Sequence, residues 1–187
     1  MQAIISTGTP VTQSLNTEWF KHEVNPAYEF SFTLTDAGLV FKAARKASAL
    51  IHPQGRRGVF QEELWKYDAA EFFITTPDKK RYMEFNLSPN GAWWACVFSA
   101  PRQVAIGYEN WKPNITALGE CREDAWSCEA LIPSSVLQDV GIIPQDCFLA
   151  ACAILNSPEQ IFLTSAHPCP GQPDFHRPDL WEKACLS

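Results

Sequence analysis

Alternating apolar and polar positions predict most of the elements of this chain. Between residues 28 and 35, aromatic and aliphatic side chains at every second position alternate with Glu, Ser and Thr. This period of two is typical of a strand with one buried face. Similar signals predict further strands over residues 39–41, 68–75, 81–87, 92–98, 125–132 and 148–155. The Ser-Pro-Asn-Gly sequence at 88–91 predicts a hairpin turn, because Pro presets the second turn position and Gly accepts a positive φ.

Helical patterning is confined to residues 134–140, which Pro133 precedes and Gly141 follows, as expected where a short helix begins and ends. Residues 48–58 are polar and basic and predict a loop, while the four prolines of residues 167–178 predict an extended connector. Many short strands with almost no helix predict an all-β fold, an antiparallel β-sandwich of immunoglobulin-like or jelly-roll type with one short helix.

Length and charge narrow the classes of protein. The 187 residues fit a single domain, 1–187, and a hydrophobic fraction of 46% is enough for a core. A net charge of -6 argues against nucleic acid as a partner. No basic amphipathic segment predicts membrane docking, and the apolar run 148–155 is too short to cross a bilayer. The oligomeric state stays open.

The start of the sequence and the cysteines bear on location. The first residues lack the basic and apolar segments of a secretory signal. Seven cysteines, an odd number without a C-x-x-C pair, favour free and mostly buried thiols in a reducing compartment. We therefore expect a cytoplasmic protein. The alternative is a periplasmic or secreted protein with one or two disulfides, if the sequence is a trimmed form.

Tryptophans supply candidate ligand contacts. The chain has seven, and each could serve core packing or edge covering. Trp65 is the best candidate for stacking on a ligand, because it lies at the mouth of a predicted strand between charged residues, where complete burial is not expected. Trp93 and Trp94 are neighbours on a strand and point to opposite faces, so at most one of them can reach the same site.

Carboxylates alternate with aromatics along two of the predicted strands. Glu71 lies on one strand, and Glu84 and Asn86 share a face of the next. One interpretation is a solvated sheet face. A second is a polar lining that accepts hydrogen bonds from ligand hydroxyls. A third is the acid and nucleophile of a glycosidase, a role that depends on a separation the sequence does not give.

A third cluster lies in the proline-rich tail. Asp174 and His176 share a face if the tail is extended, and with His167 they form a weak metal-ligand pattern, H-x6-D-x-H. The alternatives are packing on the sandwich edge, with His176 hydrogen-bonded to a neighbouring strand, or a ligand site in which Phe175 or His176 forms a wall and Asp174 accepts hydrogen bonds. The chain has no P-loop, no G-x-G-x-x-G and no G-x-S-x-G motif.

These segments together resemble a known family. Leu64-Trp65, the run from Tyr82 to Trp93 that contains E-F-N-L-S-P-N-G-A-W, and the P-D-F-H sequence at 173–176 are similar to the bacterial DOMON-like proteins, which are related to the family-9 carbohydrate-binding module. The resemblance covers residues 28–176 and implies a β-sandwich. It also implies that two aromatics hold a terminal sugar and that a Glu six residues after the first Trp bonds to it, a spacing that Trp65 and Glu71 match.

The resemblance leads to a specific expectation. We expect non-catalytic binding of a small carbohydrate, a terminal sugar unit, without a metal or other cofactor. The expected ligand-binding residues are Trp65, Glu71, Glu84, Asn86, Asp174, Phe175 and His176. The alternatives are a glycoside-active enzyme that uses paired Glu and a structural or interaction domain without a small ligand. Some related domains bind haem through Met and His, for which this chain offers Met83 on a predicted inward face.

Overall fold

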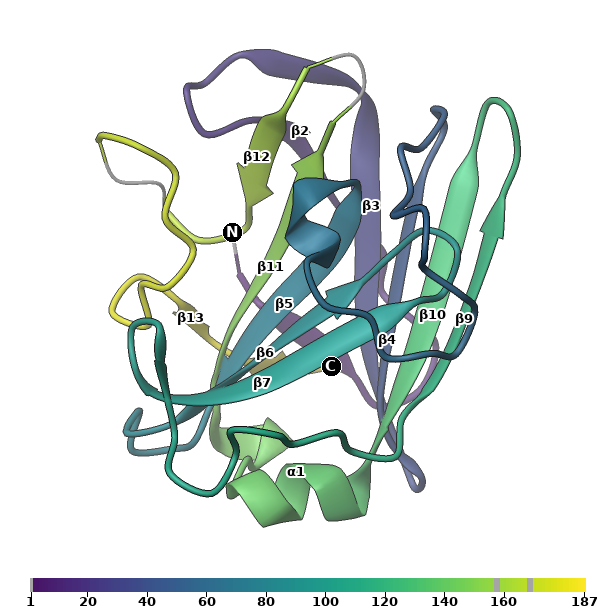
Figure 1. Ribbon diagram of the computed structural model, residues 1–187. Coiled ribbons are helices and arrows are strands. Elements are labelled where there is room, and N and C mark those ends of the chain that lie inside the picture. The colour runs from purple at the N-terminus through teal and green to yellow at the C-terminus, as the bar shows by residue number, and fades with distance from the viewer. Residues whose placement is uncertain (1, 157–158, 168–169) are drawn as a thin grey trace.

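Two facing seven-stranded sheets form the molecule (Figure 1). The computed structural model describes residues 2–156, 159–167 and 170–187. In the first sheet the strand order is β14-β1-β3-β4-β10-β9, and β2 pairs with β3. Its strands are β1 (Ile4–Ser6), β2 (Gln13–Thr17), β3 (Glu23–Thr35), β4 (Gly38–Arg45), β9 (Thr116–Cys121), β10 (Trp126–Pro133) and β14 (Cys185–Leu186).

The second sheet carries three of the seven residues predicted to bind a ligand, namely Glu71, Glu84 and Asn86. Its order is β12-β11-β5-β6-β7-β8, and β13 pairs with β11. Its strands are β5 (Ala69–Thr75), β6 (Tyr82–Leu87), β7 (Trp93–Ala100), β8 (Gln103–Val104), β11 (Phe148–Leu155), β12 (Ile161–Thr164) and β13 (Glu182–Lys183). Helix α1 (Ser134–Val140) lies at one end of the sandwich, at the bottom of Figure 1. Two 3-10 helices, Leu64–Lys66 and Pro144–Asp146, lie in connections.

Apolar side chains from the inward faces of both sheets form the core. Phe32 of β3 and Phe41 of β4 both contact Phe72 of β5, with ring centroids 5.4 and 5.0 Å apart. Met83 and Phe85 of β6 belong to the same buried cluster. Because successive strand residues point to opposite faces, this inward set leaves Glu71, Phe73, Glu84 and Asn86 on the outer face of the second sheet.

The structure confirms the predicted β-sandwich. The expected strands and helix appear within one to five residues of their predicted bounds, and α1 ends at Gly141 with a φ of 84°. Strands β2, β9 and β12 were not predicted, because they are short and partly polar edges. The first sheet is also mixed rather than wholly antiparallel, since β1 runs parallel to both β3 and β14. No helix in the described ranges has the length and apolar character to span a membrane.

The predicted hairpin turn lies against the other sheet. Gly91 has a φ of 85°, and its amide donates to the carbonyl of Ser88. A Cβ atom at Gly91 would lie 2.7 Å from the backbone nitrogen of Gly119 in β9, and a Cβ at Gly119 would be even closer to the turn. The close approach of the two backbones therefore requires glycine at both positions.

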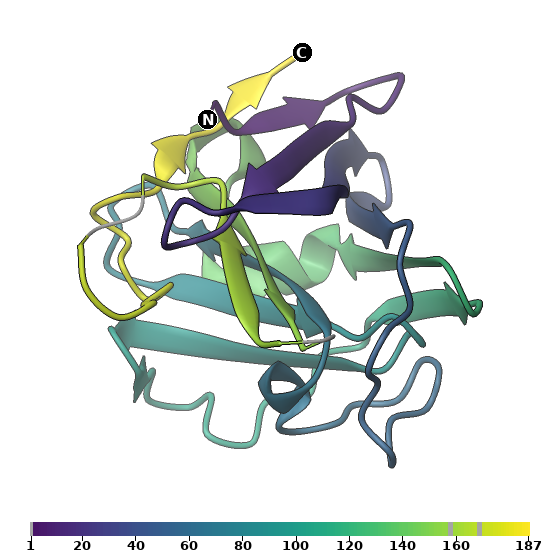
Figure 2. The same ribbon diagram turned by 90° about the horizontal axis from the view of Figure 1, so that it is seen from above.

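The C-terminal tail covers the outer face of the second sheet. Figures 1 and 2 both place it, in yellow, along one side of that sheet. The ring of Trp181 lies 5.3 Å from Phe73 and 5.1 Å from Tyr82, and its Nε1 donates to the carbonyl of Phe175 at 3.3 Å. The tail therefore forms a second apolar cluster on this face.

The cysteines agree with the prediction of free thiols where the structure describes them. Cys96, Cys128, Cys147 and Cys152 are buried, Cys121 and Cys185 are exposed, and all six are free. Cys169 and Pro168 lie outside the described residues.

Candidate functional site

A cavity of about 490 Å³ opens on the outer face of the second sheet, between the sheet, the 3-10 helix Leu64–Lys66 and the tail. Its volume is in the range of small-molecule sites. Aromatic and acidic side chains dominate its walls. The lining residues are Trp65, Glu71, Phe73, Glu84, Trp94, Phe98, Arg102, Ile154, Phe162, Pro173, Phe175 and His176.

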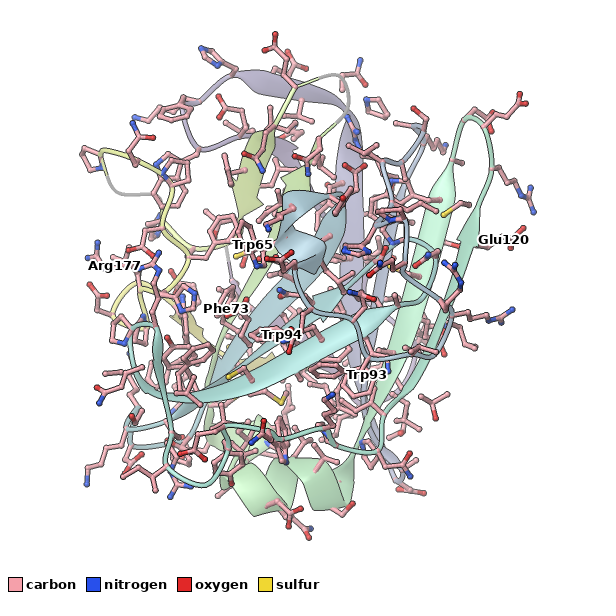
Figure 3. All side chains as sticks on the ribbon, viewed as in Figure 1. Trp65, Phe73, Trp93, Trp94, Glu120 and Arg177 are labelled. Atoms are coloured by element: carbon pink, nitrogen blue, oxygen red, sulfur yellow. The ribbon has the colours of Figure 1, made fainter. Side chains whose placement is uncertain are left out.

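Trp65 stands at the cavity with its ring half open to solvent. It lies in a 3-10 helix rather than at the mouth of a strand, and the residue is 49% exposed. The tail leaves this ring open. Trp94 also lines the cavity, whereas Trp93 is buried in the core between the sheets. Figure 3 shows Trp65, Phe73 and Trp94 gathered in one region, with Trp93 apart from them.

Two buried carboxyl groups form the inner wall. Glu71 is 2% exposed and Glu84 is 7% exposed, so the interpretation as a solvated sheet face is wrong. The sequence suggested exposure because the strands alternate, but the tail and the 3-10 helix cover this face. Burial raises the pKa of Glu84 to about 7, against the effect of its hydrogen bond from Asn86. Burial and the nearby Glu84 raise the pKa of Glu71 well above its ordinary value.

One hydrogen bond and one close contact hold the carboxyl group of Glu84. The amide Nδ2 of Asn86 donates to Oε1 of Glu84 at 3.1 Å, and Nε2 of His176 lies 3.4 Å from its Oε2. The other ring nitrogen of His176, Nδ1, lies 2.8 Å from the hydroxyl of Tyr82, which accepts from the backbone N–H of Arg102 at 3.3 Å. If the Tyr82 hydroxyl donates to Nδ1, the Nε2 proton points at Glu84. Asn86 and His176 therefore fix the orientation of the carboxyl group.

His176 is neutral in this environment. Burial lowers its pKa to about 4, and the positive charge of Arg102 acts in the same direction, while Asp174 opposes them. Its ring also lies 5.4 Å from Phe73 and 5.2 Å from Phe98. Phe175 contacts Phe73 and Phe162 across the cavity, at 6.3 and 6.2 Å between ring centroids. Both tail residues therefore serve as walls.

An ion pair fastens the tail to the sheet. Nη2 and Nη1 of Arg102 donate to the two oxygens of Asp174 at 2.8 and 3.4 Å. Asp174 Oδ1 also accepts the backbone N–H of His176 at 3.0 Å. This bidentate geometry positions the turn that carries Phe175 and His176.

Five of the seven predicted site residues line the same cavity: Trp65, Glu71, Glu84, Phe175 and His176. The other two stand behind them, since Asn86 holds Glu84 and Asp174 holds Arg102 and His176. Sequence reasoning missed Phe73, Phe98, Arg102, Ile154, Phe162 and Pro173. The alternation of β5 places Phe73 on the face of Glu71, a signal that was present in the sequence. No local pattern marked Arg102.

The weak metal and haem patterns do not assemble. His167 lies 3.4 Å from Glu182, whereas His176 contacts Glu84, so the two histidines have different partners. Among the described residues, no group of three or more His, Cys, Asp or Glu side chains is arranged to hold a metal ion. Met83 is buried between the sheets, whereas His176 lies on the opposite, outer face of the second sheet. The two are therefore not placed to ligate one haem.

A hollow of about 550 Å³ on the outer face of the first sheet has a different character. Lys42 and Glu129 cross it as an ion pair at 2.6 Å. Phe30 is the aromatic residue among its lining residues, and its ring is buried in the core. This hollow offers no open ring for stacking, so the aromatic cavity is the better ligand site.

Comparison with known proteins supports the fold. No family model matches the chain. The mouse (Mus musculus) UPF0462 protein C4orf33 homolog is 28% identical over 134 residues, which cover 67% of this chain and 64% of the mouse protein. The chain therefore aligns with less than two thirds of that relative.

Solved structures share the architecture at low sequence identity. A candidate carbohydrate-binding protein from Bacteroides uniformis has a TM-score of 0.71 at 14% identity, covering 100% of this chain and 98% of the other. A family 9 carbohydrate-binding module (CBM9) from Caldicellulosiruptor kristjanssonii, in complex with cellotriose, has a TM-score of 0.61 at 11% identity, covering 100% and 93%. The glucose complex of a CBM9 from that organism gives 0.61 at 10%, covering 100% and 96%. The chain thus has the β-sandwich fold of these proteins.

Proposed function

We propose that this protein binds a terminal sugar unit of a small carbohydrate in the aromatic cavity, without catalysing a reaction. One observation carries the proposal: the half-exposed ring of Trp65 stands at a cavity whose inner wall holds the buried carboxyl groups of Glu71 and Glu84. A sugar has an apolar face of C–H groups and a rim of hydroxyls. An open indole can stack on the face, while carboxyl oxygens bond to the rim.

The fold similarity adds support of a general kind. The CBM9 modules that share this sandwich are solved in complexes with cellotriose and glucose. The cavity of about 490 Å³ is in the size range of sites for small ligands, which fits a terminal sugar unit. The DOMON-like resemblance of the sequence fits the same proposal, with Phe175 and His176 in the place of a second stacking aromatic.

Isothermal titration calorimetry against a panel of mono- and disaccharides tests the proposal. We expect at least one sugar to bind and Trp65→Ala to weaken that binding at least about fivefold, because stacking on a single aromatic ring is worth about 1 kcal/mol or more. Ile106→Ala is the matched control, since this apolar side chain is 96% exposed and does not line the cavity. The absence of heat with every sugar, or equal binding by Trp65→Ala, would contradict the proposal.

A glycoside-active enzyme is the second candidate, and the raised pKa of Glu84, about 7, favours it. A carboxylic acid that keeps its proton near neutral pH can act as the general acid at a glycosidic oxygen, with Glu71 as the second carboxyl group. This candidate predicts turnover of aryl glycosides that Glu84→Gln abolishes. Failure of the wild-type protein to release the aryl alcohol from α- and β-linked substrates would exclude it.

A further inference from the structure

The two carboxyl groups of the cavity have no free cation beside them among the described residues. Glu71 and Glu84 both line the cavity, and Arg102 is the one lining cation among the described residues. Its guanidinium group is already engaged by both oxygens of Asp174, at 2.8 and 3.4 Å. His176 is near Glu84 but neutral, since burial lowers its pKa to about 4. The described residues therefore offer neither carboxyl group a counter-charge of its own.

Glu71 also lacks a hydrogen-bond donor. Its Oε1 is buried without a hydrogen-bond partner among the described residues, and the residue as a whole is only 2% exposed. In the sheet it lies opposite Asn86 of β6 and Cys152 of β11. The Asn86 amide donates to Glu84 instead, and its Oδ1 is likewise buried without a partner. A buried carboxyl oxygen without a donor costs free energy, which a ligand donor would recover.

The same carboxyl group is surrounded by aromatic rings. Phe73 follows Glu71 on the same face of β5, and Trp65, Trp94, Phe162 and Phe175 complete the walls. Ring faces carry a partial negative charge and attract cations, more strongly where water is excluded. An aromatic enclosure with an acidic floor therefore favours a positively charged group over a neutral hydroxyl.

We propose that the preferred ligand is a sugar carrying a protonated amine, whose ammonium group donates to Glu71 inside the aromatic enclosure. This inference rests on the proposed sugar-binding function and names the ligand class of that site. An ammonium group supplies both the missing donors and the missing charge, and hydrogen bonds between charged groups are about twice as strong as neutral ones. A neutral sugar can donate a hydroxyl hydrogen bond to Glu71, but it brings no positive charge to the carboxyl group.

Proton release accompanies binding of such a ligand. The groups that act on the two carboxyls are Arg102, Tyr82, Cys96, Cys152 and the buried Tyr28, and His176 contacts Glu84. Burial lowers the pKa of His176 and raises those of Tyr82, Cys96 and Cys152, so none of these titrates near pH 7. The proton released therefore comes from the Glu71–Glu84 pair, as the ammonium charge lowers its pKa.

Calorimetry with three related sugars tests the inference. D-glucosamine is compared with N-acetyl-D-glucosamine, which keeps the ring but loses the charge, and with D-glucose, at about pH 6, where an amine of this kind is protonated. We expect glucosamine to bind at least about tenfold more tightly than either. Its binding should also release protons, seen as a heat that changes between buffers of different ionisation enthalpy.

Variants and controls separate the two proposals. Glu71→Gln should bring the ratio of the glucose Kd to the glucosamine Kd towards one. Glu120→Gln is the control, and it should leave this ratio unchanged. Glu120 lies on the exposed strand β9, far from the site (Figure 3). Equal wild-type affinities for glucose and glucosamine would overturn the ammonium inference while the sugar site stands. Binding of no sugar at all would overturn both. Choline, an ammonium without a sugar ring, should bind at least about tenfold more weakly than glucosamine, and equal affinity would contradict the sugar assignment.

Discussion

Glu71 and Glu84 lie diagonally across two neighbouring antiparallel strands: Glu71 is paired in register with Asn86, and Glu84 with Phe73. Both carboxyl groups therefore share the outer face of the second sheet, and the tail buries both. Two buried acids on one face repel each other when ionised, which favours their protonated forms. The predictions below follow from this pair and from the tail that covers it.

Stability should depend on pH through Glu84. Its pKa is raised from about 4.5 to about 7 in the fold, so between these values the unfolded chain loses a proton that the folded protein keeps. The free energy of unfolding contributed by Glu84 is therefore full below about pH 4.5, falls as the pH rises and levels off above about pH 7. Relative to wild type, Glu84→Gln should gain up to about 3 kcal/mol across this interval, measured by urea unfolding.

The comparison with the variant is needed because His176 has the opposite effect. Its pKa is lowered from 6.5 to about 4, so its contribution is lost as the pH falls through that interval. The two groups partly cancel in wild-type protein, and the difference between wild type and Glu84→Gln removes the His176 contribution and leaves that of Glu84, together with its effect on Glu71. A difference that stays constant between about pH 4.5 and 7.5 would contradict the raised pKa of Glu84.

Loss of the Arg102–Asp174 ion pair should affect the position of the tail more than the stability of the whole fold. Both side chains of the pair are substantially exposed, so Asp174→Ala should lower the free energy of unfolding by less than about 1 kcal/mol. The same change should speed hydrogen exchange in residues 170–178 and weaken sugar binding severalfold, because the turn with Phe175 and His176 loses its anchor. In the control Asp179→Ala, which breaks a local pair with Arg177, sugar affinity should not change. Unchanged exchange and affinity in Asp174→Ala would show that the ion pair does not position the tail.

Two tryptophans on the same face should differ in their effect on stability. Trp181 is buried against Phe73 and Tyr82, so Trp181→Ala should cost about 3 kcal/mol or more in urea unfolding. Trp65 is 49% exposed, and Trp65→Ala should cost less than about 1 kcal/mol. Similar losses in both variants would mean that the Trp65 ring is buried in solution.

Much of the fold was predictable because the burial of one face of a strand or helix produces a periodic pattern in the local sequence. The alternation along β3, β5 and β6 separates an inward from an outward face, and Pro133 and Gly141 bound α1 in the sequence itself. The pairing of Trp65 with Glu71 was also accessible, because the family that the sequence resembles implies a spacing that these two residues match. Strands β2 and β12 lack such a periodic pattern, because they are short edge strands with few inward residues.

The burial of the site was not predictable from the strands alone. Glu71 and Glu84 sit on a face that would be solvated without residues 173–181, which lie about ninety residues further along the chain than Glu84. Arg102 joins the site through a contact with Asp174, 72 residues away, and no short-range pattern records such a contact. The shifted pKa values are consequences of this tertiary packing, so they appear only once the tail is docked.

The most direct test follows the indole N–H signals of the tryptophans by nuclear magnetic resonance during a sugar titration, with assignments from Trp65→Phe, Trp94→Phe and Trp93→Phe. Trp65 and Trp94 line the cavity, and Trp93 lies in the core between the sheets. The account predicts that a bound sugar shifts the signals of Trp65 and Trp94 and leaves that of Trp93 nearly unchanged. Unshifted Trp65 and Trp94 signals in the presence of a sugar that binds would contradict the assignment of the cavity as the carbohydrate site.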